Sequence, residues 1–153
     1  LKDVGVCTTD EVGELVWKRR DWPAGIEEVA RKYRITEAWD CPTFAHLATA
    51  IQRGFVVDYG IAVGSNFDTD ANGWVSEGKG RGGHAMCGVG LSKRTKNGKT
   101  QWGIVTANSW GTNWGVNGFG IVPASYFANE LFTDGWAVRV AIDPSDDQWR
   151  KTA

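Results

Sequence analysis

Residues 107–119 read ANSWGTNWGVNGF, and no other run in the chain is as informative. The run places Asn108 directly after a predicted strand and continues with two Trp-Gly pairs that begin at Trp110 and Trp114. Predicted strands lie on either side of it, at 100–107 and 118–122. An asparagine at a strand end usually bonds its own backbone in a turn, so Asn108 alone indicates no function.

A second segment lies upstream, reads GGHAM over 82–86 and contains His84. It places a histidine at the start of a predicted strand, after glycines that let a ligand or another backbone approach closely. A single histidine beside glycine is more often structural than catalytic. The two segments are informative because they occur together and in this order.

Together, the two segments resemble the papain family of cysteine peptidases. The resemblance covers 82–85 and 108–119, and a looser match extends back through 43–51 and 55–63. In that family the looser segments form a short helix and then a strand. The resemblance therefore implies an α+β fold, specifically the β-rich half of a papain-like fold with two or three short helices.

The resemblance also implies roles for five residues. His84 would be the general base that pairs with a cysteine thiolate, and Asn108 would accept the other imidazole N–H and fix the ring. Trp110 would lie over this contact and exclude water; the alternative interpretation is a core tryptophan, and the two roles are compatible. Gly83 and Trp114 would support the site. Gly83 departs from the family pattern at the position before the histidine, which puts substrate contacts there in doubt.

The nucleophile that this chemistry requires is not evident in the sequence. In the family, the cysteine precedes the histidine by about 130–150 residues, which places it before Leu1. We therefore expect the nucleophile and the oxyanion-hole glutamine upstream of Leu1 or on another chain. The alternative is Cys41, which begins a predicted helix whose dipole would lower the thiol pKa. Cys7 is a weaker candidate, and Cys87 is expected to be a small buried thiol.

Two functional hypotheses follow from the resemblance. The first is a papain-like cysteine endopeptidase that hydrolyses peptide bonds through a thiolate and His84, with Asn108 orienting the ring. Its partners would be a protein or peptide substrate and an N-terminal papain-like half from the same precursor or a second chain. The second is a catalytically inactive papain-like module with a structural or binding role in a larger assembly such as a virus particle.

Composition excludes several other classes of protein. The 153 residues include 17 Lys+Arg and 18 Asp+Glu, a net charge of -1 that does not suit a nucleic-acid binder. No apolar run is long enough to cross a membrane. Three cysteines are an odd number and do not identify a redox compartment, so secreted, lysosome-like and virion-associated locations all stay open.

The pattern along the chain predicts short helices first and strands afterwards. Asp21 is the expected N-cap of a helix over 23–33, and a second helix is expected over 42–53, ended by Gly54. A mostly antiparallel sheet or barrel follows, with strands near 55–63, 85–92, 100–107, 118–122 and 135–142. An Asn-Gly hairpin turn is expected at 96–99.

We interpret residues 1–153 as one domain, the C-terminal part of a papain-like peptidase domain. Its expected parts are an irregular and helical segment at 1–54, a β-rich segment with the His/Asn site at 55–142, and a tail at 143–153. The connection at 64–83 is long and rich in Gly and Asp, which indicates function or partial mobility.

No cofactor or metal is expected. Residues 68–73 read DTDANG and match the first half of a calcium-binding loop, but Lys79 occupies the position of the bidentate glutamate. We therefore predict an ordinary turn there. A zinc site from Cys41, His46, His84 and Cys87 lacks paired ligand spacing, and His46 is expected to be a surface or packing residue.

Overall fold

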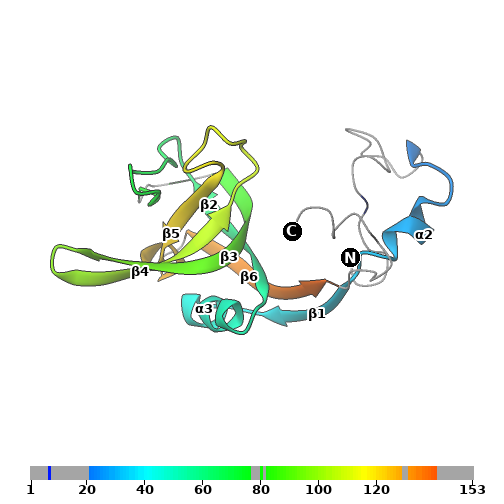
Figure 1. Cartoon of the computed structure of the whole chain (residues 1–153), viewed down its shortest axis with the longest axis horizontal. Helices are drawn as coiled ribbons and strands as arrows, with labels where there is room; N and C mark the ends of the chain where they lie inside the picture. The colour runs from blue at the N-terminus through cyan, green and yellow to red at the C-terminus, as the bar shows by residue number, and fades with distance from the viewer. Residues whose placement is uncertain (1–6, 8–20, 77–79, 81, 129–130, 141–153) are drawn as a thin grey trace. The chain divides into compact units, whose positions relative to one another are not determined.

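The computed structural model describes residues 7, 21–76, 80, 82–128 and 131–140. The chain divides into two compact units (Figure 1), of which one comprises Leu1–Ala38 and Arg139–Ala153 and the other Trp39–Val138. The predicted tail at 143–153 lies outside the described residues, as does Lys79. The interpretation of residues 1–153 as one domain stays a prediction.

In the first unit, the helix α2 (Ile26–Ala30) is shorter than the predicted 23–33. It begins after Gly25, whose φ of 81° is left-handed and interrupts a regular helix. No side chain caps its first turn, so the prediction that Asp21 is the N-cap is wrong.

A six-stranded sheet in the order β1-β6-β2-β3-β4-β5 forms most of the described structure. The pairs from β6 through β5 are antiparallel, as predicted. The strands are β1 (Ile35–Asp40), β2 (Val56–Val63), β3 (Gly82–Lys96), β4 (Lys99–Ala107), β5 (Phe119–Pro123) and β6 (Phe132–Val140). The α+β fold class, rich in antiparallel sheet, is confirmed.

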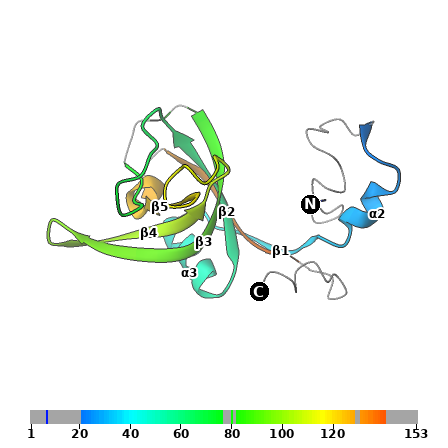
Figure 2. The same ribbon diagram turned by 45° about the horizontal axis from the view of Figure 1, so that its top comes forward.

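The β3–β4 hairpin extends from the sheet in both ribbon views (Figures 1 and 2). Its turn contains Asn97 with φ 52° and Gly98 with φ 71°. Positive φ at both central residues is typical of the two-residue turn that matches the twist of paired strands. The predicted turn at 96–99 is therefore confirmed.

The helix α3 (Phe44–Gln52) lies within the predicted 42–53. Thr43 caps it by accepting a hydrogen bond from the His46 backbone N–H at 3.4 Å. The helix ends at Arg53, followed by Gly54 with φ 83°, a conformation that glycine adopts without strain. No helix among the described residues is long and apolar enough to span a bilayer.

Two elements were not expected from the sequence. β1 reads ITEAWD and is mostly exposed, so it lacks the apolar alternation of a half-buried strand. The 3-10 helix η2 (Ala124–Ala128) follows β5 directly and buries two aromatic side chains, Tyr126 and Phe127.

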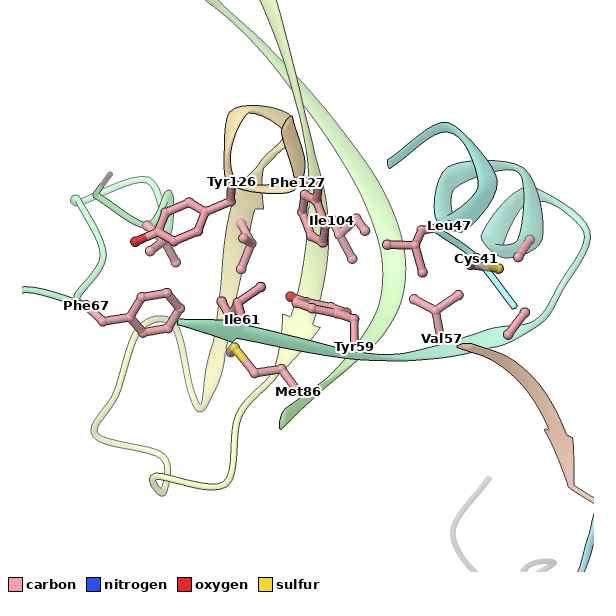
Figure 3. Packing of buried hydrophobic residues seen from close by; sticks show 14 of the residues in the cluster. Cys41, Leu47, Val57, Tyr59, Ile61, Phe67, Met86, Ile104, Tyr126 and Phe127 are labelled. Atoms are coloured by element: carbon pink, nitrogen blue, oxygen red, sulfur yellow. The ribbon is translucent and has the colours of Figure 1, made fainter. Parts of the chain in front are cut away.

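The core lies on one face of the sheet, with α3 and η2 packed against it (Figure 3). β2 contributes Val57, Tyr59 and Ile61, all at most 1% exposed. The Thr106 hydroxyl donates to the Ile104 carbonyl at 3.2 Å, so the Tyr59 hydroxyl donates to Thr106 Oγ1 at 2.5 Å. This chain of bonds satisfies the buried polar groups of an otherwise apolar layer.

Candidate active site

The strand register brings His84 and Asn108 together. His84 lies near the start of β3, opposite Ile61, on the face that carries the core. Cys87 of β3 pairs with Ala107, the last residue of β4. Because the two strands are antiparallel, Asn108, the next residue, lies beside the start of β3. Two residues 24 positions apart therefore meet at the edge of the apolar layer.

The His84–Asn108 contact fixes which atoms donate. His84 Nε2 lies 2.9 Å from Asn108 Oδ1. The same oxygen accepts the Ser109 backbone N–H at 2.8 Å, which identifies it as the amide oxygen because an amide nitrogen cannot accept. Nε2 must therefore be protonated, and the neutral ring has its acceptor lone pair on Nδ1.

Trp110 covers this contact. Its ring stacks on the His84 ring with centroids 4.8 Å apart and planes 22° apart. The indole is 46% exposed, so it lies between the imidazole and solvent rather than in the core. The core tryptophan of the motif is Trp114, which is 8% exposed and donates its Nε1–H to the Phe67 carbonyl at 3.1 Å.

Glycines shape the turn that presents Asn108 and Trp110. Gly111, Gly115 and Gly118 all have positive φ, at 83°, 59° and 85°. A Cβ at Gly115 would also collide with the backbone oxygen of Phe119. The glycine spacing of the motif therefore follows from the backbone path of this turn.

Gly83 has a different environment. It pairs with Ala62 at the start of β3, and a Cβ there would meet nothing within 4 Å. This part of the fold thus leaves open space immediately beside His84.

Cys41 is placed in the core. It is 4% exposed, and its backbone N–H donates to the Gly135 carbonyl at 2.8 Å. Burial, followed by the nearby Asp40 charge, raises the thiol pKa against the opposing hydrogen bond from the Ala137 backbone. The expected lowering of its pKa by a helix dipole is therefore wrong, because Cys41 lies two residues before Thr43, the N-cap of α3, and burial raises the pKa.

Cys87 also differs from an activated thiol. Cys87 is half-buried, and burial followed by the Asp58 charge raises its pKa. Cys7 is partly exposed and donates weakly to the Ile26 carbonyl at 3.6 Å. Cys41 and Cys87 therefore both have a raised thiol pKa, the opposite of what a nucleophile requires.

The remaining candidates form local structure. Asp70 Oδ1 accepts the backbone N–H groups of Asn72 and Trp74 at 2.9 and 3.0 Å, which is the predicted turn. His46 is exposed, and its Nδ1 lies 2.7 Å from Thr43 Oγ1, consistent with a surface residue. The described residues contain no group of three or more His, Cys, Asp or Glu placed to hold a metal ion.

Comparison with known proteins identifies the family of the chain. A family profile described as papain family cysteine protease matches residues 23–126. The chain belongs to the papain family of cysteine proteases. An uncharacterized peptidase C1-like protein, L477, of Acanthamoeba polyphaga mimivirus is 36% identical over 107 residues, or 65% of this chain and 32% of its own length.

Two solved papain-like structures show the same fold. Xylellain, a cysteine protease from Xylella fastidiosa, superposes with a TM-score of 0.62 at 22% identity, over 89% of this chain and 57% of its own. The clostridial cysteine protease Cwp84, after propeptide cleavage, gives 0.65 at 16% identity, over 95% and 39%. The chain therefore spans 32% of the length of the mimivirus protein, 57% of xylellain and 39% of Cwp84.

Phe67 is a residue of this site region that sequence reasoning missed. It is 4% exposed and contacts the rings of both Trp110 and Trp114. The only signal was its position in the long 64–83 connection, which indicates function in general terms but no particular residue.

Proposed function

We propose that this chain is the His/Asn-bearing half of a cysteine endopeptidase. The observation that supports this most directly is the 2.9 Å contact from His84 Nε2 to Asn108 Oδ1, beneath Trp110. The contact leaves Nδ1 as the ring atom that takes a proton from a thiol. Imidazole oriented by a hydrogen-bonding third group is the arrangement that activates a cysteine or serine nucleophile.

In the proposed reaction, Nδ1 of His84 accepts the thiol proton and forms an ion pair with the thiolate. The thiolate attacks the peptide carbonyl carbon, and the imidazolium then donates its Nδ1 proton to the leaving amine. Water hydrolyses the acyl-enzyme with His84 again as base. Throughout, Asn108 holds the Nε2–H and the ring plane.

The nucleophile would come from a part of the protein outside residues 1–153. The environment of Cys41 argues against it as the nucleophile, because its thiol is buried in the core and its pKa is raised. The peptidase proposal therefore requires a second half that supplies a cysteine opposite Nδ1 of His84 and the oxyanion-hole donors.

The outer face of the sheet is the surface on which we place this second half. A row of residues crosses five strands on that face, each residue pairing with the next in the strand register. The residues at its two ends are aromatic, and each is 44% exposed. Its members are Trp136, Asp58, Cys87, Ala107 and Phe119. Beside it, Ala85 follows His84 directly and pairs with Gly60, so this face carries only small groups next to the His84 backbone.

One donor at the site is buried without a hydrogen-bond partner among the described residues. Asn108 Nδ2 is buried, and no described residue accepts its hydrogen bonds. A buried unsatisfied donor costs about 1–3 kcal/mol. This half therefore keeps one unsatisfied polar group at the site.

The test is covalent labelling of the complete natural polypeptide with a peptidyl epoxide that alkylates activated cysteines. Mass spectrometry should find one adduct, on a cysteine outside residues 1–153. The His84→Ala variant should lose the adduct, whereas His46→Ala, which alters the other histidine, should keep it.

Two outcomes would contradict the proposal. An adduct on Cys41 that depends on His84 would mean that the nucleophile lies within this chain. No adduct on any cysteine of the complete folded polypeptide would favour the non-catalytic module with a structural or binding role.

A further inference from the structure

We propose that Phe67 is a positioning residue for His84 and acts through Trp110. The proposal deepens the proposed function and rests on it, because it assigns part of the orientation of the base to the 64–76 loop. His84, Asn108 and Trp110 are held by strand ends, whereas Phe67 comes from a separate segment of the chain.

The aromatic contacts form a continuous path to the imidazole. Phe67 stacks on Trp114 with centroids 5.9 Å apart and planes 8° apart. Trp110 meets the Phe67 ring edge-on at 5.8 Å and the Trp114 ring edge-on at 6.0 Å. The same indole stacks on His84 at 4.8 Å.

Phe67 supplies support that Trp110 lacks otherwise. Trp110 is 46% exposed, so solvent rather than protein covers much of its surface. Of its three ring contacts, one is the imidazole itself and two are Phe67 and Trp114. Removing the Phe67 ring would leave Trp114 as the remaining ring support, and the indole would gain freedom to turn away from His84.

Phe67 is itself fixed, because the loop is anchored on two sides. On one side, Val75 N–H donates to Ile121 O at 2.9 Å and Ile121 N–H donates to Gly73 O at 2.7 Å. These bonds pair the loop with β5, the edge strand. They hold the backbone next to the turn that carries Trp114.

On the other side, Arg94 of β3 holds the loop. Its Nη1 lies 2.6 Å from Asp70 Oδ2, and its Nε donates to Gln101 Oε1 at 2.7 Å. Its guanidinium also lies 4.3 Å from the centre of the Trp74 ring. One planar guanidinium that donates to two side chains and stacks on an indole is a geometry that lysine cannot reproduce.

The test measures the His84 tautomer by 15N NMR of the complete natural polypeptide, labelled at histidine. Residues 1–153 contain two histidines, and the His84→Gln and His46→Gln variants assign their signals. In the unaltered protein, His84 should show the Nε2–H form as the dominant neutral tautomer. Phe67→Leu should produce a mixture of tautomers and reduce the ring-current shift that Trp110 imposes on the imidazole protons.

Phe127→Leu is the matched control. Phe127 is 6% exposed and contacts the rings of Phe44, Tyr59 and Phe132, with no ring contact to Trp110. It should lower stability as Phe67→Leu does, and yet leave the His84 signals unchanged. Unchanged His84 signals in Phe67→Leu, or equal changes in both variants, would overturn the proposal.

A second variant covers the case in which Phe67→Leu does not fold. Arg94→Met removes the guanidinium that anchors the loop, and it should shift the His84 signals in the same direction by a smaller amount. No shift in that variant would also overturn the proposal. Epoxide labelling separates the two hypotheses: labelling without these NMR changes contradicts the role of Phe67 alone, whereas the NMR changes without labelling contradict the peptidase function.

Discussion

Each of the two histidines has a polar partner, but the two partnerships have different origins. His46 bonds Thr43, three residues away in the cap of α3, and its side chain is exposed. His84 bonds Asn108, 24 residues away on the neighbouring strand end, and lies under an indole. The first contact follows from helix capping alone, whereas the second requires the correct sheet register. A cysteine, Cys41, lies just before α3, so residue types alone would favour His46 over His84.

The largest expected effect comes from replacing each histidine in the complete protein. His84→Ala should lower kcat/KM on a peptide substrate by about 10³-fold, because general acid–base catalysis is lost. His46→Ala should change it by less than about twofold. Steady-state kinetics on both variants checks this. A large loss in His46→Ala would reverse the comparison.

The second prediction removes the hydrogen-bond partner of each histidine and compares the effects on activity and on stability. Asn108→Ala frees the His84 ring, and kcat/KM should fall about 10- to 100-fold with little change in unfolding free energy. Thr43→Ala should instead lower the unfolding free energy by about 1 kcal/mol through loss of the cap, with activity retained. Urea unfolding and kinetics on the same preparations separate the two cases. Equal activity losses would show that the His84 contact has no special role.

The third prediction concerns the Cys41 thiol. Its raised pKa and burial should make it react with iodoacetamide at least about tenfold more slowly than a free cysteine at neutral pH. His46→Ala should not change that rate, because His46 lies at the surface. Time-resolved peptide mass spectrometry measures it, with the urea-unfolded chain as the control. Rapid labelling that depends on His46 would make the α3 region the reactive one.

The smallest expected effects concern two aspartates whose pKa values are shifted in opposite directions. Burial, and then the Asp134 charge, raises the pKa of Asp58 against a hydrogen bond from the Tyr59 backbone. The folded protein therefore holds this proton more tightly than the unfolded chain does. The stability it contributes is full below its ordinary pKa and is lost as pH rises through the raised value. Asp58→Asn should reduce this pH-dependent loss of unfolding free energy by less than about 1 kcal/mol.

For Asp70, burial would raise the pKa, but hydrogen bonds from the Trp74 backbone, Arg94 and the Asn72 backbone, with the Arg94 charge, lower it. The stability it contributes is present above its ordinary pKa and is lost as pH falls through the lowered value. Asp70→Asn should remove this acid sensitivity. Urea unfolding from about pH 3 to about pH 7 measures both variants. The same sign of effect in the two would contradict the assignment.

Most of the sheet could be predicted from the sequence because its determinants are local. Alternation over 55–63 identifies β2 and its inward face, and Asn97-Gly98 specifies the hairpin between β3 and β4. β1 was missed because an edge strand with little burial needs no apolar alternation. The start of α2 was misplaced because Gly25 adopts a left-handed conformation that Pro23 does not reveal.

The residues of the site also differ in whether the sequence alone reveals them. His84, Asn108 and Trp110 could be proposed because their motifs resemble those of the papain family, and the structure brings the three together. Phe67 could not, because its contact with Trp110 depends on how the 64–76 loop folds back onto β5. The pKa of the Cys41 thiol also depends on packing, since a pattern in sequence shows neither where the helix begins nor how deeply the thiol is buried.

Because of the open space around Gly83, substitutions at this position could change activity without changing the stability of the fold. Because a Cβ at this residue would touch none of the described residues, substitutions there should leave the stability of this half unchanged. Any preference for glycine at position 83 must then be imposed from outside the half, by the docked partner or by a bound peptide. A library of side chains at this position, scored for folding and for activity in parallel, would therefore map the surroundings of His84 in the complete protein.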